Sequence, residues 1–270
     1  MYVRAPVAAD LGAWKAYGWR SQPDPARAVD EHAAFRAELG RTGATLEIGA
    51  ARAPNDPDAI YAYDPVLMTD AGAVLLRPGK EGRRAEPEAV SSDLSAAGIA
   101  IAGRIEAPGT AEGGDLLWLD RWTLLAGRGY RTNGEGIAQL RVLLGGSIDV
   151  IEFDLPHFRG PAECLHLMSF VSPLDADLVV AYLPMMPVRL LEILGDRDIR
   201  IVEAPDDEFA SMGPNVLALG PRIALALDGN PETRRRLEAA GVDVRAYVGD
   251  EISRKGDGGP TCLTRPLERE

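Results

Sequence analysis

The chain has 270 residues, of which 46% are hydrophobic and 26% are charged. These proportions are typical of a soluble globular protein and exclude disorder as its main state. Lys and Arg number 29 against 41 Asp and Glu, so the formal net charge is −12. This balance argues against nucleic acid or an anionic membrane surface as a partner and favours a small cationic one.

No apolar run approaches the roughly 20 residues of a membrane span, and the first residues lack a signal-peptide pattern, so we expect a cytoplasmic protein. The chain has two cysteines, Cys164 and Cys262. Two are too few for a disulfide framework or a zinc cluster, and we expect no metal site.

The first half of the chain alternates between short strands and helices. Asp24 and Pro25 predict the start of a helix that ends at Gly40. Turn residues between apolar runs then predict two hairpins, one at 66–76 and one at 116–126. The predicted elements after the first helix are strands 44–48, 60–64, 66–68 and 73–76, a helix at about 87–97, strands 116–119 and 124–126, and a helix at 133–144.

The second half repeats this order of elements without repeating the sequence. Its predicted elements are strand 150–153, strands at about 168–171 and 178–181, helix 188–194, strands 199–202, 215–219 and 223–227, helix 232–240 and strand 244–247. Paired strands followed by a helix and a further strand favour a mixed α/β fold over a doubly wound parallel sheet. Because Pro and Gly are spread evenly, we expect one domain over residues 1–270.

Cys262 ends the glycine-rich segment Gly256-Asp257-Gly258-Gly259-Pro260-Thr261-Cys262. Glycines let a backbone approach a ligand closely, so a reactive thiol is one interpretation, and a loop cysteine without a role is the other. Cys164 is better interpreted as a buried structural residue.

The chain has three histidines that could act with a thiol. His32 is predicted on the solvated side of the first helix. His157 is interpreted mainly as a loop residue against an aromatic neighbour. His166, flanked by apolar residues, resembles a buried core histidine when taken alone.

The segment 109–117 places Glu112 and Asp115 around two glycines before an apolar strand. These acids could face a pocket and hold a cation, but taken alone the segment is better interpreted as an ordinary loop. The chain has neither a phosphate-binding glycine loop nor a His-Glu-x-x-His motif.

Taken together, Glu112-Gly113-Gly114-Asp115, Arg131-Thr132-Asn133, His166-Leu167 and Gly258-Gly259-Pro260-Thr261-Cys262 resemble, in order and spacing, the guanidino-modifying enzymes of the pentein superfamily. An upstream block from Pro57 to Asp64, followed by Arg77-Pro78-Gly79 and Arg83-Arg84, resembles the substrate-binding part of that family. The resemblance spans about 58–267. It implies an α/β fold in which five ββαβ-type modules form a five-bladed pseudosymmetric propeller around a central pocket.

The resemblance also implies a role for each matching residue. Cys262 would attack the central carbon of a guanidinium, and His166 would protonate the departing amine and then activate water. Glu112 and Asp64 would bind the guanidinium nitrogens. This is physically reasonable, because a bound cation favours the thiolate and compensates buried carboxylates.

Further matches concern the amino-acid end of the substrate. Arg83 and Arg131 match arginines that bind its carboxylate, and a planar fork suits that task. Asp58 matches an acid near its α-amino group, although a role as a turn residue stays open. Two positions depart from the family: Tyr63 stands where an acid or a base is usual, and Met168 stands where deiminases have a second acid.

Met168 favours a substrate with an alkylated nitrogen. We therefore expect a cofactor-free hydrolase that converts dimethylarginine to citrulline and an alkylamine. The alternatives are an arginine deiminase, an amidinotransferase, and a non-catalytic binding protein on the same scaffold. A homodimer stays open.

Overall fold

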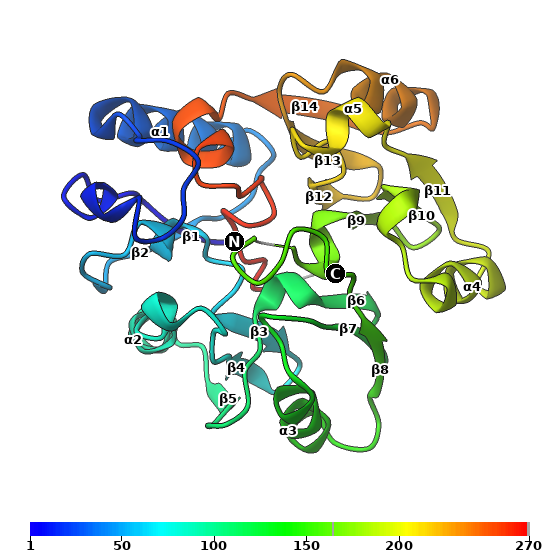
Figure 1. The fold of residues 1–270 in the computed structure, drawn as a ribbon, viewed down its shortest axis with the longest axis horizontal. Coiled ribbons are helices and arrows are strands. Elements are labelled where there is room, and N and C mark those ends of the chain that lie inside the picture. Colours follow the sequence, from blue (N-terminus) through cyan, green and yellow to red (C-terminus); the bar gives the residue numbers. More distant parts are fainter. Residues whose placement is uncertain (164, 269–270) are drawn as a thin grey trace.

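The computed structural model describes residues 1–163 and 165–268, and its strands form five small sheets that surround the middle of the molecule (Figure 1). Within the described residues, four sheets have three strands and one has two. Helices lie on the outside of the ring, and the N-terminus lies near its middle (Figure 1). The predicted mixed α/β fold is confirmed.

Each three-stranded sheet follows one pattern. Its first two strands form an antiparallel hairpin, a helix follows, and the third strand returns parallel to the second. The four units are β3 (Val66–Thr69), β4 (Gly72–Leu75), α2 (Glu86–Ala96) and β5 (Ile101–Arg104); β6 (Leu116–Asp120), β7 (Thr123–Arg128), α3 (Gly134–Leu144) and β8 (Asp149–Asp154); β9 (Val171–Asp175), β10 (Leu178–Ala181), α4 (Val188–Asp196) and β11 (Arg200–Glu203); and β12 (Val216–Gly220), β13 (Ile223–Leu227), α6 (Pro231–Ala239) and β14 (Asp243–Tyr247).

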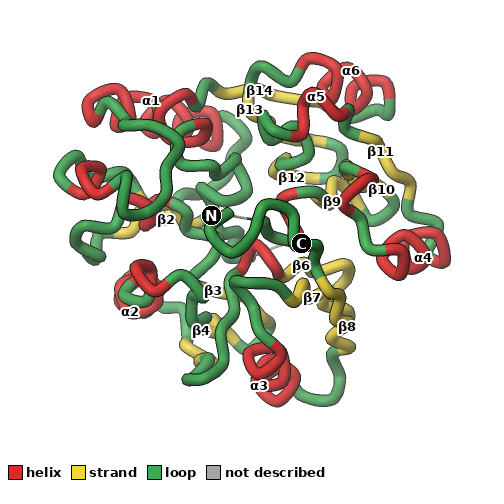
Figure 2. The backbone as a smooth tube through the Cα atoms, viewed as in Figure 1, coloured by secondary structure: helices red, strands yellow, loops and turns green. Residues whose placement is uncertain are grey.

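The fifth sheet joins the two ends of the chain. Strand β1 (Tyr2–Arg4) pairs in parallel with β2 (Glu47–Gly49), and helix α1 (Pro25–Gly40) lies between them in sequence. Tyr2 also forms an antiparallel bridge with Arg265 near the other end. Arg265 thus pairs with β1 in the antiparallel sense that a first strand has toward the second strand in the other four units. Figure 2 shows helix α1 on the outside of the ring, where α2, α3, α4 and α6 lie in the other units.

Helix α1 begins at the predicted residue, but the residues on its buried face contradict one prediction. The Asp24 carboxylate accepts hydrogen bonds from two backbone N–H groups of the first turn, and Pro25 is the first helical residue. Its buried face contains Ala28, His32 and Phe35, so the prediction of a solvated His32 is wrong. His32 is 0% exposed, and burial, with the nearby Arg36, lowers its pKa to about 3.

Both predicted hairpins are confirmed, while two predicted strands are wrong. Residues 60–64 continue from the short 3-10 helix Pro57–Ile60 into a turn. Asp56 caps that helix by accepting from the backbone N–H of Asp58 at 2.9 Å. Residues 167–169 also form a 3-10 helix, and β9 starts only at Val171. Strands β1 and β5 and the short helix α5 (Asp206–Phe209) were not predicted.

Apolar side chains fill the spaces between each sheet and its neighbours. The largest fully buried ones come from the strands and from the helix faces that cover them, for example Leu116, Leu124 and Leu94. Among the described residues, no helix is both long and apolar enough to cross a membrane.

Candidate active site

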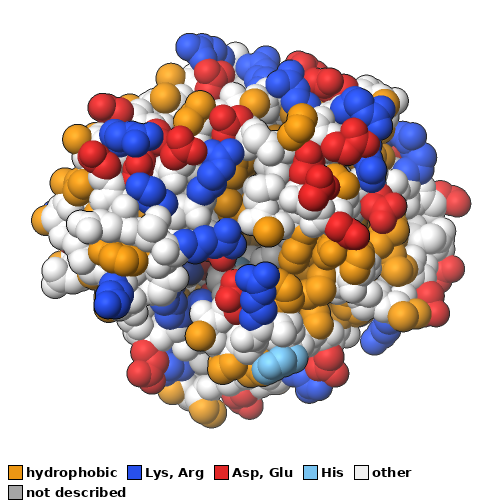
Figure 3. Space-filling view, turned by 45° about the horizontal axis from the view of Figure 1, so that its top comes forward, with side chains coloured by type: hydrophobic (Ala, Val, Ile, Leu, Met, Phe, Trp, Pro, Cys, Tyr) orange, Lys and Arg blue, Asp and Glu red, His pale blue; other side chains and the backbone are white. Residues whose placement is uncertain are grey.

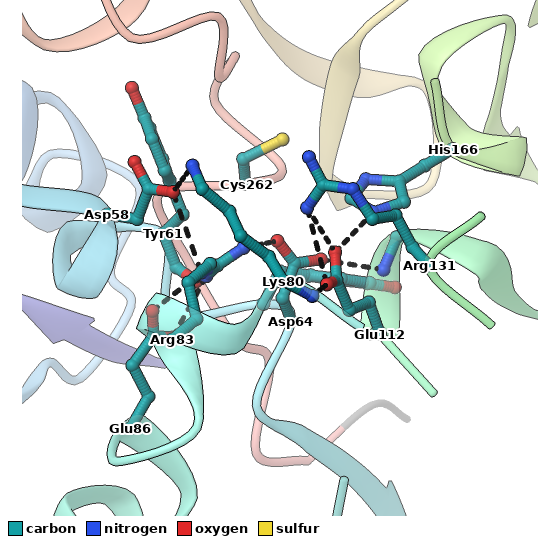
Figure 4. Close-up of polar contacts among 12 residues, drawn as sticks. Asp58, Tyr61, Asp64, Lys80, Arg83, Glu86, Glu112, Arg131, His166 and Cys262 are labelled. Carbon is teal, nitrogen blue, oxygen red and sulfur yellow. Dashed lines mark hydrogen bonds and ion pairs between the residues drawn. The ribbon is translucent and has the colours of Figure 1, made fainter. Parts of the chain in front are cut away.

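The site residues come from segments that enter the first strand of successive units. Asp64 precedes β3, Glu112 precedes β6, and His166 precedes β9. Cys262 precedes Arg265, which pairs with β1. Four residues that are far apart in sequence therefore meet near the middle of the ring (Figure 4).

His166 and Glu112 form a buried hydrogen-bonded pair. Nε2 of His166 lies 2.8 Å from Oε2 of Glu112, and the two residues are 4% and 0% exposed. His166 precedes the 3-10 helix Leu167–Ser169, and its backbone N–H donates to the Ser169 hydroxyl at 2.9 Å. Gly114 lies against the ring, where a Cβ would be 2.6 Å from Cγ of His166. Packing and hydrogen bonds thus fix the imidazole in one orientation, as proton transfer requires.

Asp64 is held by the turn that carries Glu112. Its Oδ1 accepts from the backbone N–H of Gly114 at 2.8 Å, and its Oδ2 accepts from Nη1 of Arg83 at 2.6 Å. Burial by itself would raise the pKa of this carboxyl, but the positive charges of His166 and Arg83 hold it below its ordinary value. Asp64 therefore stays ionised beside His166.

Glu112 is ionised although it is fully buried. Nη1 of Arg131 lies 3.1 Å from its Oε2, and the backbone N–H of Lys80 donates to its Oε1 at 3.1 Å. Burial opposes ionisation, but Arg131 and the hydrogen bond with His166 hold the pKa of Glu112 well below its ordinary value. The site thus offers two carboxylates suited to a planar cation.

Cys262 is half-buried, and its Sγ is directed toward the side of the site where Arg131 and His166 lie (Figure 4). Nδ2 of Asn215 donates to Sγ at 3.6 Å, and the backbone N–H of Tyr63 donates to the carbonyl of Cys262 at 3.2 Å. The cysteine is therefore tied to two other segments of the chain.

The glycines before Cys262 serve packing within the protein. A Cβ at Gly256 or Gly258 would collide with the ring of Tyr61, and Trp19 also lies against Gly256. Gly256 and Gly258 therefore leave room for aromatic side chains of the protein itself. The close approach of a ligand to this loop stays a prediction.

Arg83, predicted to bind a substrate carboxylate, is surrounded by acceptors of the protein. Its guanidinium donates to Asp64, to both carboxylate oxygens of Glu86 at 2.6 and 2.9 Å, and to the carbonyl of Tyr61 at 3.2 Å. Arg83 is 2% exposed. Arg131, with the same predicted role, binds Glu112 instead. Both roles stay predictions.

Asp58 does not reach the His166–Glu112 pair and is bound elsewhere. Its Oδ1 accepts from Nε1 of Trp19 at 2.7 Å, and its Oδ2 forms an ion pair with Nζ of Lys80. The same ammonium donates to the carbonyl of Tyr17 at 2.6 Å. Lys80 was not predicted as a site residue. Its position in the basic segment 77–84 was the available signal, but sequence alone does not show which of those cations turns inward.

The remaining candidates lie in different surroundings. Tyr63 is 5% exposed, and the guanidinium of Arg265 stacks 3.5 Å from the centre of its ring. Met168 is 4% exposed within an apolar cluster. His157 is exposed and lies 2.6 Å from the hydroxyl of Tyr130. Cys164 lies outside the described residues.

Asp64, Glu112 and His166 could also hold a metal ion, because one ligand atom from each lies within 4.8 Å of the others. However, arginines already provide positive charge at both carboxylates. The arrangement therefore suits an organic cation at least as well. Figure 3 shows basic and acidic side chains around the hollow in the middle of one face, with hydrophobic side chains gathered to one side.

Two buried carboxylates, a histidine bound to one of them and a nearby cysteine, set in a ring of ββαβ units, define a guanidino-modifying enzyme of the pentein type. The Arginine deiminase family profile matches residues 184–269. The N(G),N(G)-dimethylarginine dimethylaminohydrolase of Streptomyces coelicolor is 30% identical over 91% of this chain and 88% of that protein. The enzyme of the same name from Pseudomonas aeruginosa is 29% identical over 90% of this chain and 89% of its own.

A structure of the Pseudomonas aeruginosa enzyme, in a variant bound to citrulline, superimposes with a TM-score of 0.79. It shares 27% identity, and the match covers 97% of this chain and 96% of that chain. The chain belongs to the dimethylarginine dimethylaminohydrolase family.

Proposed function

We propose that this protein hydrolyses dimethylarginine to citrulline and dimethylamine through a covalent intermediate on Cys262. The observation that carries the proposal is the buried His166–Glu112 pair at 2.8 Å, with Asp64 ionised beside it. The names of the two relatives support the substrate, and the citrulline bound to the Pseudomonas aeruginosa structure supports the product.

In the first half of the reaction, the Cys262 thiolate attacks the central carbon of the guanidinium. A C–S bond forms, and His166 donates a proton to the dimethylated nitrogen. The C–N bond then breaks, and dimethylamine leaves with the bonding pair and that proton. The covalent thiouronium that remains is still positively charged, so Glu112 and Asp64 continue to compensate it.

In the second half, neutral His166 takes a proton from water while the water oxygen attacks the same carbon. The C–S bond breaks, and the sulfur leaves as a thiolate. The carbonyl of citrulline forms as the remaining hydroxyl proton passes to solvent. The balance is dimethylarginine plus water in, and citrulline plus dimethylamine out, with no cofactor needed.

Arginine deimination is the second candidate, because the Arginine deiminase family profile matches the part of the chain that contains Cys262. Met168 argues against it. Its thioether lies in an apolar cluster and offers no second carboxylate to an unsubstituted guanidinium. A dimethylated nitrogen needs no such partner.

The test is a comparison of dimethylarginine and arginine at equal concentration, with citrulline, dimethylamine and ammonia measured together. We expect faster citrulline formation from dimethylarginine. Dominant ammonia release from arginine would replace the substrate assignment with deimination. Loss of citrulline when glycine is added would identify an amidinotransferase.

The nucleophile is tested separately with Cys262→Ser. This variant should lose turnover while its unfolding midpoint stays unchanged, because a hydroxyl is far less ionised than a thiol near neutral pH. A haloacetamidine should label Cys262 in the wild-type chain, as found by mass spectrometry. Retained turnover in the variant would refute the role of Cys262, and absence of the adduct would favour a non-catalytic binding protein.

We further infer that the five sheets are the blades of a five-bladed propeller, and that residues 1–270 form one domain. The isolated bridge between Tyr2 and Arg265, which pairs the first strand of the chain with a segment far along the sequence, supports both. A cytoplasmic location, a homodimer and the lack of a nucleic-acid or membrane partner stay proposals. Light scattering during size-exclusion chromatography tests the dimer.

A further inference from the structure

Asn215 occupies, in the fourth unit, the position that site residues occupy in the others. Asp64, Glu112 and His166 each lie in the segment that enters the first strand of a unit, and Asn215 directly precedes β12. It is 5% exposed. No motif in the sequence identifies it as part of the site.

The side chain of Asn215 connects the segments that carry the two predicted catalytic groups. Nδ2 lies 3.6 Å from Sγ of Cys262 and 3.5 Å from the carbonyl oxygen of Met168, two residues after His166. Oδ1 accepts from the backbone N–H of Thr261 at 3.3 Å. One amide thus contacts the nucleophile, the residue before it and the histidine segment.

These neighbours determine which way the amide faces. A backbone N–H can only donate, so Thr261 must face the amide oxygen. A carbonyl can only accept, so Met168 must face the amide nitrogen. The group beside Sγ of Cys262 is therefore an N–H donor.

We propose that Asn215 is a positioning residue that stabilises the Cys262 thiolate by donating a hydrogen bond to Sγ. The inference rests on the proposed function in that it takes Cys262 as the nucleophile. A donor favours the charged form of its acceptor, so the thiol gives up its proton to solvent more readily while the amide stays neutral. Through its contact with the Met168 carbonyl, the same amide also links the sulfur to the segment that carries His166.

A purely structural role is the alternative, because the loop is also docked on this residue. A Cβ at Gly259 would lie 2.6 Å from Cγ of Asn215, and the Thr261 hydroxyl donates to the carbonyl of Val216 at 3.2 Å. The two roles differ in one measurable way. A tether does not change the pH at which the thiol ionises, whereas a donor to sulfur does.

The experiment measures the alkylation rate of Cys262 by iodoacetamide against pH in the full chain, with the modified peptide quantified by mass spectrometry. Asn215→Leu keeps a similar shape and removes the donor. We expect it to raise the midpoint of the profile by about one pH unit. Asn215→Asp keeps the acceptor for Thr261 but places a negative charge beside sulfur, so its midpoint should rise further.

Turnover provides a second readout. In Asn215→Leu, kcat should fall most at low pH. It should recover once the pH exceeds the raised midpoint of the Cys262 alkylation profile, because the thiol then ionises without the hydrogen bond from Asn215. The control is Asn230→Leu. Asn230 is 6% exposed and donates to the carbonyls of Ser211 and Leu227, so the Cys262 profile should not move.

A folded Asn215→Leu variant with the wild-type midpoint would overturn the proposal. So would a shift in Asn215→Asp alone, because that would assign the effect to the added charge. If Asn215→Leu does not fold, Asn215→Ala removes the same donor and is judged by the same profile. Alkylation needs no substrate, so failure of this inference is distinguishable from failure of the proposed function.

Discussion

Gly114→Ala should reduce turnover by displacing His166 while the fold is retained. The new methyl group would lie 2.6 Å from Cγ of His166, and closer still to Nδ1. The backbone of Gly114 is not in the positive-φ region, so alanine meets no backbone strain there. Steric pressure on the imidazole is therefore the main effect of the substitution.

The size of the effect follows from the distances. Ordinary contact begins at 3.4 Å, so the ring must move by about 0.8 Å or more, a misplacement that costs on the order of 100-fold in rate. The bond between Nε2 and Glu112 is now 2.8 Å. A shift of that size away from Glu112 would lengthen it past hydrogen-bonding distance. We expect kcat to fall about 100-fold, with a smaller change in KM.

The assay is citrulline formation from dimethylarginine under saturating substrate, with thermal unfolding measured in parallel. Gly134→Ala is the matched control, because a Cβ at Gly134 has nothing within 4 Å and lies in the first turn of α3. It should keep wild-type kcat. A Gly114→Ala variant with kcat within about twofold of wild type would refute the assignment of His166 as the proton carrier.

Lys80→Met removes the ammonium that now binds Asp58 and the carbonyl of Tyr17, so both acceptors become available to the α-amino group of a substrate. The ratio of the KM for dimethylarginine to the KM for an analogue without the α-amino group should therefore fall by up to about tenfold. An unchanged ratio of the two KM values would contradict a role of Asp58 at the α-amino end. His32→Leu should stabilise the fold by about 1–3 kcal/mol at pH 7.5, since both ring nitrogens of His32 are buried without a partner among the described residues. The folded pKa of His32 is about 3, below its unfolded value of about 6.5, so wild-type stability is lost as the pH falls between these values. The increase in the free energy of unfolding caused by His32→Leu, measured by urea unfolding, should therefore be about 2 kcal/mol larger at pH 5 than at pH 7.5. An equal increase at both pH values would show that the pKa of His32 is not lowered in the folded protein.

Local chemistry explains why the hairpins and most helices could be predicted. The hydrogen bonds of the turn 69–72 and of the N-terminal caps of α1 and α3 join residues that are at most three positions apart. Such contacts can therefore be predicted from the local sequence alone. The failure at 60–64 has a different origin. Neighbouring units cover both sides of this segment and bury all four of its apolar residues, Ile60, Tyr61, Ala62 and Tyr63. An apolar run of this kind looks like a strand.

His32 shows where the sequence held enough information and the interpretation was wrong. Ala28, His32, Phe35 and Leu39 are spaced as one face of a helix, and the structure buries them together. His32 was instead predicted to lie on the polar, solvated side of the helix. Periodicity was the stronger signal, since it depends on the geometry of the helix and not on the polarity of a single side chain.

The sequence indicated candidate site residues, whose roles stay predictions, but it did not indicate the contacts among them. Glu112, His166 and Asp64 were found through their motifs, and the structure brings them within hydrogen-bonding reach of one another or of shared partners. Asn215 and Lys80 were missed, because their partners lie on segments that only the closed ring brings together. An asparagine or a lysine in the sequence does not by itself indicate a position in the site.

The ion pair at Glu112 suggests how a cationic substrate would be bound. The carboxylate is 0% exposed and already binds the guanidinium of Arg131. A buried carboxylate without a partner would be strongly destabilising, so we expect a substrate that binds Glu112 to replace the guanidinium of Arg131. The exchange would release Arg131 toward the far end of the substrate, where its predicted role with a carboxylate lies. The net charge of −12 does not by itself predict such a site, because the two carboxylates that would bind the cation, Glu112 and Asp64, are only two of the 41 acidic residues.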